Sequence, residues 1–213
     1  MHSAKHMSKT DWKAILIIGA GVGLLIQPIL ANNLAAYRLG FAVQAGVFLF
    51  FVAFAPFALW MFRLLSKKWQ GLYEFAKFAA VGTLNSFIDI GVLNLETFLY
   101  GSTMMSNTVF AVFKAVSFLF ATTNSFLWNK YWTFSANSTP KTGEVASFYT
   151  VAVIGWALNV GVATLVKAFG PVDSKTWITI VAPLAGVAAS FLWDFFGYKY
   201  FVFRKEGASA PQA

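Results

Sequence analysis

The chain has 213 residues, of which 58% are hydrophobic, 18% aromatic and 11% charged. A soluble domain carries about a quarter charged residues, so this composition indicates a membrane protein and excludes an ordinary soluble enzyme. The absence of cysteine excludes disulfides and thiolate metal sites. The formal net charge is +8, and the placement of the basic residues indicates membrane topology rather than nucleic-acid binding.

Six continuous apolar stretches, each close to the ~20 residues that a helix needs to cross a bilayer, predict an all-α membrane protein. The predicted spans are 14–31, 39–62, 78–99, 109–128, 145–166 and 178–198. They divide the chain into a cytoplasmic N-terminus (1–13), an N-terminal transmembrane hairpin (14–66), a four-helix transmembrane domain (67–205) and a disordered tail (206–213).

The basic residues favour one orientation of these spans. With both termini inside, twelve Lys and Arg lie at cytoplasmic ends and three lie outside, which satisfies the positive-inside rule. We therefore expect a multi-pass protein of the cytoplasmic (inner) membrane. A signal peptide is the alternative interpretation of the first stretch, although its 18 apolar residues are longer than the usual signal core.

The last four spans resemble two copies of one helical hairpin. At a shift of 70 positions Asp89 aligns with Asn159, and at a shift of 69 Lys130 aligns with Lys199. Two copies of an even number of spans have the same orientation, so an axis along the membrane normal would relate them. The shared composition of membrane interfaces is the alternative explanation.

Polar side chains recur at helical spacing within four of the spans, so each set shares one helix face. They are Asn85, Asp89 and Glu96 in the third span, Lys114, Ser117 and Asn124 in the fourth, Asn159 with Gly155 in the fifth, and Ser190 and Asp194 in the sixth. Such residues are costly in hydrocarbon and often mark a functional pathway. Helix packing is the competing interpretation, and we favour packing for small residues such as Gly19 and Gly23.

Two acidic residues need a partner or a proton because of their depth. Asp89 lies near the middle of the third span, where a carboxylate should be protonated or paired. Glu96 and Lys114 lie at comparable depth on adjacent helices, so we expect them to pair. Their pair would either fix helix register or form a polar patch for a lipid headgroup, and the sequence leaves both possibilities open.

Aromatic and basic residues alternate where the fourth and sixth spans end. The polar members are Asn129, Lys130 and Trp132 in one segment and Lys199 and Arg204 in the other. An interfacial belt explains this pattern. A surface that binds an anionic phosphate at the inner leaflet is the alternative.

The sequence lacks the usual signs of catalysis. It has no phosphate-binding Gly-Lys-Ser/Thr loop and no His or Glu array, and its two histidines lie at the N-terminus. We therefore expect no cofactor, no bound metal and no enzymatic activity.

The motifs of the last four spans follow a recognisable order. They are Phe78-x3-Gly82-x2-Asn85-x3-Asp89, then FLWNKYWTF at 126–134, then KYFVF at 199–203. Together they resemble the GtrA-like family of small four-span membrane proteins, with a coverage of about Glu74 to Arg204. Ser125, where the family commonly has Asn, and the additional N-terminal hairpin depart from the pattern.

The resemblance implies a role in cell-surface polysaccharide synthesis. Family members are proposed to move polyprenyl-phosphate-linked sugars across the membrane, or to anchor the glycosyltransferases that make them. The matching positions are Asn85, Asp89, Asn129, Lys130, Trp132 and Phe134.

We expect a flippase for such a lipid-linked sugar, working in contact with membrane lipid. An anchor or accessory subunit of a polyprenyl-phosphate glycosyltransferase is the alternative. A small solute exporter acting as a dimer is the third hypothesis, and a homo-oligomer is compatible with all three.

Overall fold

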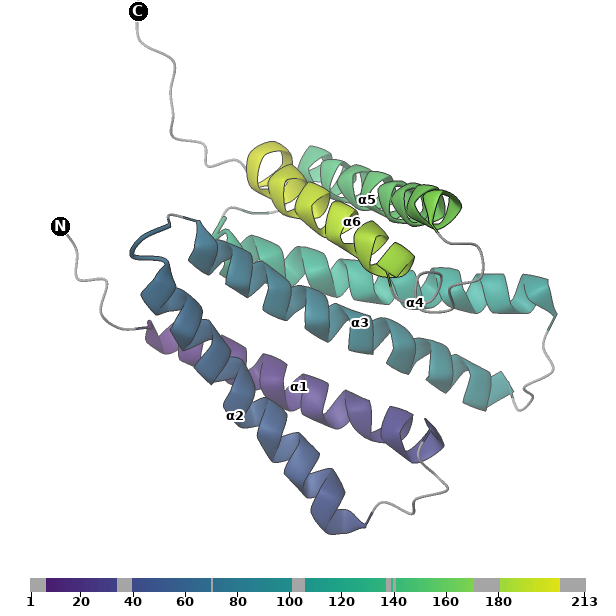
Figure 1. Cartoon of the computed structure of the whole chain (residues 1–213), viewed down its shortest axis with the longest axis horizontal. Coiled ribbons are helices and arrows are strands. Elements are labelled where there is room, and N and C mark those ends of the chain that lie inside the picture. Colours follow the sequence, from purple (N-terminus) through teal and green to yellow (C-terminus); the bar gives the residue numbers. More distant parts are fainter. Residues whose placement is uncertain are drawn as a thin grey trace, which may run out of the picture. The chain divides into compact units, whose positions relative to one another are not determined.

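The computed structural model describes residues 7–33, 40–69, 71–100, 106–136, 139, 141–170 and 181–203 (Figure 1). Within these residues the regular secondary structure is helical. The helices are α1 (Lys9–Asn33), α2 (Phe41–Leu65), α3 (Leu72–Tyr100), α4 (Asn107–Trp128), α5 (Thr142–Phe169) and α6 (Ala182–Gly197), with π-helical turns η2 (Asn129–Thr133) and η4 (Tyr198–Val202).

Four of the described helical segments are long and apolar enough to cross a membrane. They are Lys9–Gln27, Phe41–Leu65, Leu72–Leu93 and Thr142–Val166. The predicted all-α membrane protein is therefore confirmed. The count of six spans stays a prediction, because α4 and the described part of α6 are not among these segments and residues 171–180 lie outside the description.

The chain forms two compact units, which divide between Thr133 and Phe134. In the first unit α1 packs against α2 and α3, and α3 packs against α4 (Figure 1). Ile15 and Ile18 of α1 and Val81 of α3 are almost completely buried in the core of this unit. The N-terminal hairpin thus shares a core with the third and fourth helices.

Small residues let α1 and α2 approach closely. A Cβ atom added at Gly19 would lie 2.6 Å from the carbonyl oxygen of Phe51, and one added at Gly23 would lie 3.1 Å from that of Phe48. The first distance is too short for any Cβ unless the backbone moves, and the second is tight enough that α2 would have to shift by a few tenths of an ångström. The structure therefore supports the packing interpretation of this glycine pair.

A short turn joins α2 to α3 and sets their antiparallel arrangement. Gly71 in this turn has a φ of 89°, a conformation that a glycine adopts without steric cost. The turn brings the C-terminal end of α2 next to the N-terminal ends of α3 and α1, where Asp11 pairs with Lys77 (Figure 1). Arg63 in the last turn of α2 and Lys77 in α3 consequently lie at one end of this unit, and the orientation of the spans stays a prediction.

The second unit is the hairpin of α5 and α6 with the turn η4 packed against α5. An aromatic cluster holds it together. The rings of Phe148 and Tyr198 stack with centroids 4.2 Å apart, and those of Phe134 and Phe203 stack at 5.5 Å.

Both π-helical turns follow the second helix of a hairpin, and their first residues, Asn129 and Tyr198, are 69 positions apart. This spacing equals the sequence shift that aligns Lys130 with Lys199. The coincidence supports the predicted duplication of the hairpin, which remains a prediction.

Candidate functional site

Predicted polar residues of α3 and α4 meet along the seam between the two helices. Ser117 Oγ donates a 2.6 Å hydrogen bond to Asp89 Oδ1, and Asn124 Nδ2 donates a 2.7 Å bond to Asn85 Oδ1. Ser117 is completely buried. Asp89 therefore has a partner within its own hairpin, and this seam contributes to packing whatever else it does.

The expected pair of Glu96 and Lys114 stays a prediction. Glu96 Oε2 is buried and has no hydrogen-bond partner within the described part of the chain. The side chain of Lys114 lies outside the described residues.

The polar residues of the turn η2 are buried, whereas one interpretation of the sequence placed them on a phosphate-binding surface. Asn129 and Lys130 are fully buried, and Trp132 is 5% exposed. The helix continues through this segment, so alternating residues do not separate into an exposed and a buried side as they would in an extended chain. Asn129 Nδ2 donates to Ser125 Oγ at 3.1 Å. Lys130 is therefore buried rather than exposed, and its predicted contact with a phosphate stays a prediction.

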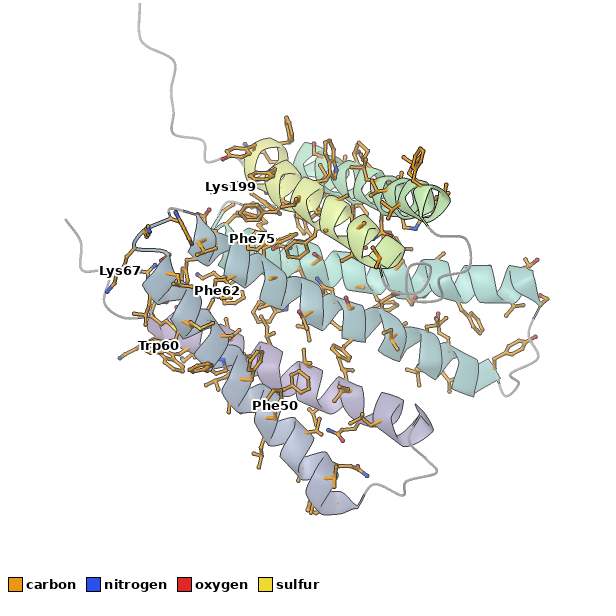
Figure 2. The ribbon with its side chains drawn as sticks, in the orientation of Figure 1. Phe50, Trp60, Phe62, Lys67, Phe75 and Lys199 are labelled. Carbon is orange, nitrogen blue, oxygen red and sulfur yellow. The ribbon has the colours of Figure 1, made fainter. Side chains whose placement is uncertain are left out.

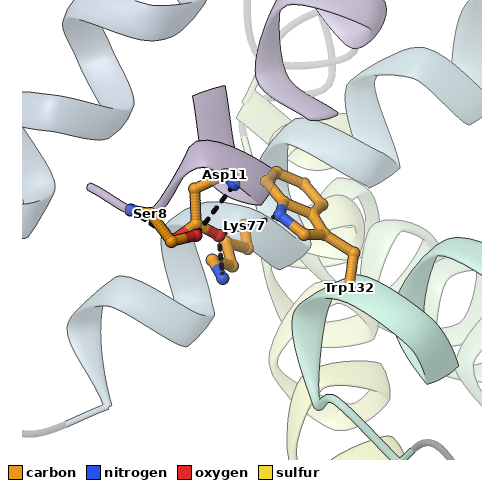
Figure 3. A network of polar contacts seen from close by, with 4 residues as sticks. All are labelled: Ser8, Asp11, Lys77 and Trp132. Atoms are coloured by element: carbon orange, nitrogen blue, oxygen red, sulfur yellow. Dashed lines mark hydrogen bonds and ion pairs between the residues drawn. The ribbon is translucent and has the colours of Figure 1, made fainter. Parts of the chain in front are cut away.

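A buried polar network, which the sequence reasoning missed, fixes the position of Trp132 (Figure 3). Trp132 Nε1 donates a 3.0 Å hydrogen bond to Asp11 Oδ1, and Lys77 forms an ion pair with the same carboxylate. Ser8 Oγ donates to Asp11 Oδ2 at 2.8 Å and accepts from Asp11 N at 3.0 Å. The network joins α1, α3 and η2.

One local signal could have revealed part of this network. Ser8 and Asp11 stand three positions apart before an apolar run, which is the pattern of a helix-capping box with Asp in place of Glu. No local pattern links Asp11 to Trp132, because the contact spans 121 positions.

Beside this network α1, α4 and η2 line an open cavity of about 410 Å³ at the surface of the first unit. Its walls carry Thr10, Lys13, Ala14, Ile17, Asn124, Leu127, Trp128, Tyr131 and Trp132. The rings of Trp128 and Trp132 meet edge to face with centroids 5.8 Å apart. Aromatic rings offer flat apolar faces, while an amide, a hydroxyl and an ammonium group offer hydrogen bonds and a positive charge. This set of side chains suits a ligand that combines a sugar ring with a phosphate.

The second hairpin has its own polar contacts. Asn159 Nδ2 donates to Ser190 Oγ at 3.2 Å. Asp194 Oδ1 is buried and has no hydrogen-bond partner within the described residues, and its carboxylate lies where a Cβ on Gly155 would sit. Asn159 and Asp194 therefore both face the interface between α5 and α6.

At the end of this hairpin Lys199 Nζ lies 5.6 Å from the ring centroid of Phe195 and 5.9 Å from that of Tyr200. Aromatic rings therefore flank its ammonium group, as a cation at a membrane interface would be. Arg204 lies outside the described residues.

The sequence comparison decides the family. The family model of the GtrA/DPMS transmembrane domain matches residues 77–203, which is more than half of the chain. The chain belongs to the GtrA/DPMS transmembrane family. No curated protein and no solved structure matches it.

The GtrA/DPMS domain includes most but not all of the features described above. It begins at Lys77 in α3, so α1, α2 and the start of α3 lie outside it. The predicted GtrA-like resemblance is confirmed. Asp11 and the α1 wall of the aromatic cavity come from outside the GtrA/DPMS domain, whereas Asn124, Trp128 and Trp132 come from within it.

Proposed function

We propose that the protein flips a polyprenyl-phosphate-linked sugar across the cytoplasmic membrane for cell-surface polysaccharide synthesis. Membership of the GtrA/DPMS transmembrane family supports this class of substrate. The observation that carries the proposal is the cavity lined by Trp128, Tyr131, Trp132 and Asn124. It offers aromatic and amide groups to a sugar at one end of a helical membrane unit.

In this proposal the sugar enters the cavity while the polyprenyl tail stays in lipid. Lys13 lines the cavity and is exposed, so it can contact the phosphate. Lys130 is buried and does not line the cavity. Lys199 and Arg204 of the second hairpin stay predicted phosphate-binding residues, and the proposed role of the cavity does not depend on them. We place the end of the first unit that carries the cavity at the cytoplasmic face, as the positive-inside rule favours.

Reconstitution into liposomes with a labelled polyprenyl-phosphate sugar tests the proposal. We expect the protein to accelerate transbilayer movement of the label. Trp128→Ala should slow it about tenfold, since the loss of one aromatic contact worth ~1.5 kcal/mol corresponds to that factor. Trp156→Ala is the matched control, because Trp156 is 63% exposed on α5 and does not line the cavity. A protein that gives no acceleration would refute the proposal.

A second function has specific support from the seam between α3 and α4. Asp89 and Asn85 are hydrogen-bonded within their hairpin, as expected of a scaffold that anchors a glycosyltransferase without transporting anything. Such a scaffold would co-purify with the enzyme, and Trp128→Ala would leave polysaccharide synthesis unchanged.

A further inference from the structure

A long apolar groove lies among α1, α2 and α3, on the part of the chain that the family match mostly leaves out. Its volume is about 270 Å³. Its lining includes Ile18 of α1, Phe51, Ala58 and Phe62 of α2, and Phe75 and Thr83 of α3. Thr83 Oγ1 donates to the carbonyl oxygen of Ala79 at 3.0 Å. The hydroxyl is therefore satisfied, and the wall behaves as an apolar surface.

The length of the groove matches one leaflet of a bilayer. On α2 it runs from Phe51 to Phe62, which is roughly 17 Å at 1.5 Å per residue. Half of the hydrocarbon layer measures about 15 Å. The small alanine side chains on α2 and α3 leave room for a ligand, and phenylalanine rings form the sides of the groove. One extended hydrocarbon chain therefore fits it.

Basic residues stand at one end of the groove. Arg63 follows Phe62, and its guanidinium lies 4.6 Å from the ring centroid of Tyr73. Arg63 Nε is buried and has no hydrogen-bond partner within the described residues. Lys67 and Lys68 are exposed in the next turn, and Figure 2 places Lys67 at the same end of the α2 and α3 hairpin as Phe62 and Phe75.

The charge at this end is positive. The acidic residues described at this end are Glu74 in the first turn of α3 and Asp11, which is paired with Lys77. The cations there are Arg63, Lys67, Lys68 and Lys77, so the positive charges outnumber the negative ones by two. Clusters of Lys and Arg beside a membrane helix attract anionic lipid headgroups, with about 1 kcal/mol for each residue.

We propose that this groove binds one acyl chain of an anionic phospholipid, whose headgroup phosphate lies at Arg63, Lys67 and Lys68. The leaflet-length groove favours a glycerophospholipid over a polyprenyl carrier, because a polyprenyl chain is far longer than one leaflet. The bound lipid fills the space between α2 and α3 and fastens the N-terminal hairpin to the rest of the first unit. This site is separate from the aromatic cavity and does not depend on the proposed transport.

Native mass spectrometry of the full-length protein tests the site. The protein is titrated with phosphatidylglycerol and with phosphatidylcholine of the same chain length. We expect one phosphatidylglycerol to bind about tenfold or more tightly than phosphatidylcholine, given three basic residues. Ala58→Phe fills the groove and should weaken phosphatidylglycerol binding about tenfold, as expected when a snug apolar site is occupied.

Ala53→Phe is the matched control, because Ala53 is exposed on the same helix and does not line the groove. Arg63→Gln combined with Lys67→Gln and Lys68→Gln leaves the groove open and should remove only the preference for the anionic lipid. Thermal unfolding of each variant shows whether it folds, and the triple variant tests the headgroup site even if Ala58→Phe does not fold.

Equal binding of the two lipids would overturn the headgroup assignment. Unchanged binding by a folded Ala58→Phe would overturn the groove assignment. Displacement of phosphatidylglycerol by an equimolar polyprenyl phosphate would identify the carrier as the occupant instead. Because the titration contains no sugar, its result is independent of whether the protein proves to be a flippase.

Discussion

Asp11 connects more elements of the first unit than any local pattern around it suggests. Its carboxylate accepts hydrogen bonds from Ser8, just before α1, and from Trp132 of η2, and it forms an ion pair with Lys77 of α3. Asp11 is 7% exposed and Lys77 is 9% exposed. A buried charge that loses its partner is costly, although a matched apolar pair in the same place need not be.

This asymmetry predicts the outcome of a double-mutant cycle. Asp11→Leu alone leaves Lys77 buried without its ion-pair partner and should cost about 3–5 kcal/mol of unfolding free energy. Asp11→Leu combined with Lys77→Met removes both charges and should recover most of that loss. Thermal or denaturant unfolding in detergent measures Asp11→Leu, Lys77→Met and the double variant, and simple additivity of the two single losses would contradict the prediction.

Substitutions at Asp89 and at its partner Ser117 distinguish a role of Asp89 in helix packing from a role in proton-coupled transport. Asp89→Asn keeps an Oδ1 acceptor for Ser117 but cannot gain or lose a proton. If transport is coupled to protons through Asp89, this variant should retain downhill flipping in liposomes and lose any acceleration by an imposed pH gradient. Ser117→Ala breaks the same hydrogen bond without removing the ionisable group and should keep the acceleration. An Asn variant that still responds to the gradient would exclude Asp89 as the proton carrier.

At the scale of the elements, the contact between α1 and α2 depends on the missing side chain of Gly19. Gly19→Val would place a Cβ 2.6 Å from the carbonyl oxygen of Phe51, so the helices must separate. We expect a loss of about 1–3 kcal/mol, as in other overpacked interiors. Gly46→Ala in α2 is the control, because nothing lies within 4 Å of its added Cβ. Melting temperatures of both purified variants check the prediction, and equal values would contradict it.

The turn η2 shows how the course of the backbone can change the exposure expected for a side chain. A lysine among aromatic residues at the end of a span is typical of an interfacial anchor, yet Lys130 is fully buried. The π-helical turn continues α4 into the packed interior against α3. A residue whose helix ends at the interface would instead reach water, so the course of the backbone decides between an anchor and a buried cation.

At the scale of the whole molecule, the predicted topology can be tested directly because the chain has no cysteine. Single cysteines at Lys67 and Thr139 should react with a membrane-impermeant maleimide only from the cytoplasmic side. A cysteine at Gly40, which is exposed with nothing within 4 Å of its added Cβ, should react only from outside. Labelling of Lys67→Cys and Gly40→Cys from the same side would contradict the predicted number and orientation of the spans.

Helical periodicity was sufficient to predict which polar residues of α3 share a face, but not which residues of α4 they contact. Asn85 and Asp89 are four positions apart and therefore share a face, and the structure pairs them with Asn124 and Ser117. The same reasoning could not predict the burial of Lys130 or the contact from Trp132 to Asp11. Those features depend on how far one helix slides and rotates against another, which a periodic pattern leaves free.

The sequence by itself determined that the chain is helical, lies in a membrane and belongs with the GtrA-like proteins, because hydropathy, helical spacing and short motifs are properties of neighbouring residues. The tertiary structure alone decided that α1 supplies one wall of the aromatic cavity and that α1, α2 and α3 enclose a groove. Those spaces arise only when helices distant in the chain pack in one register, with glycine and alanine at the contacts and larger residues around the openings.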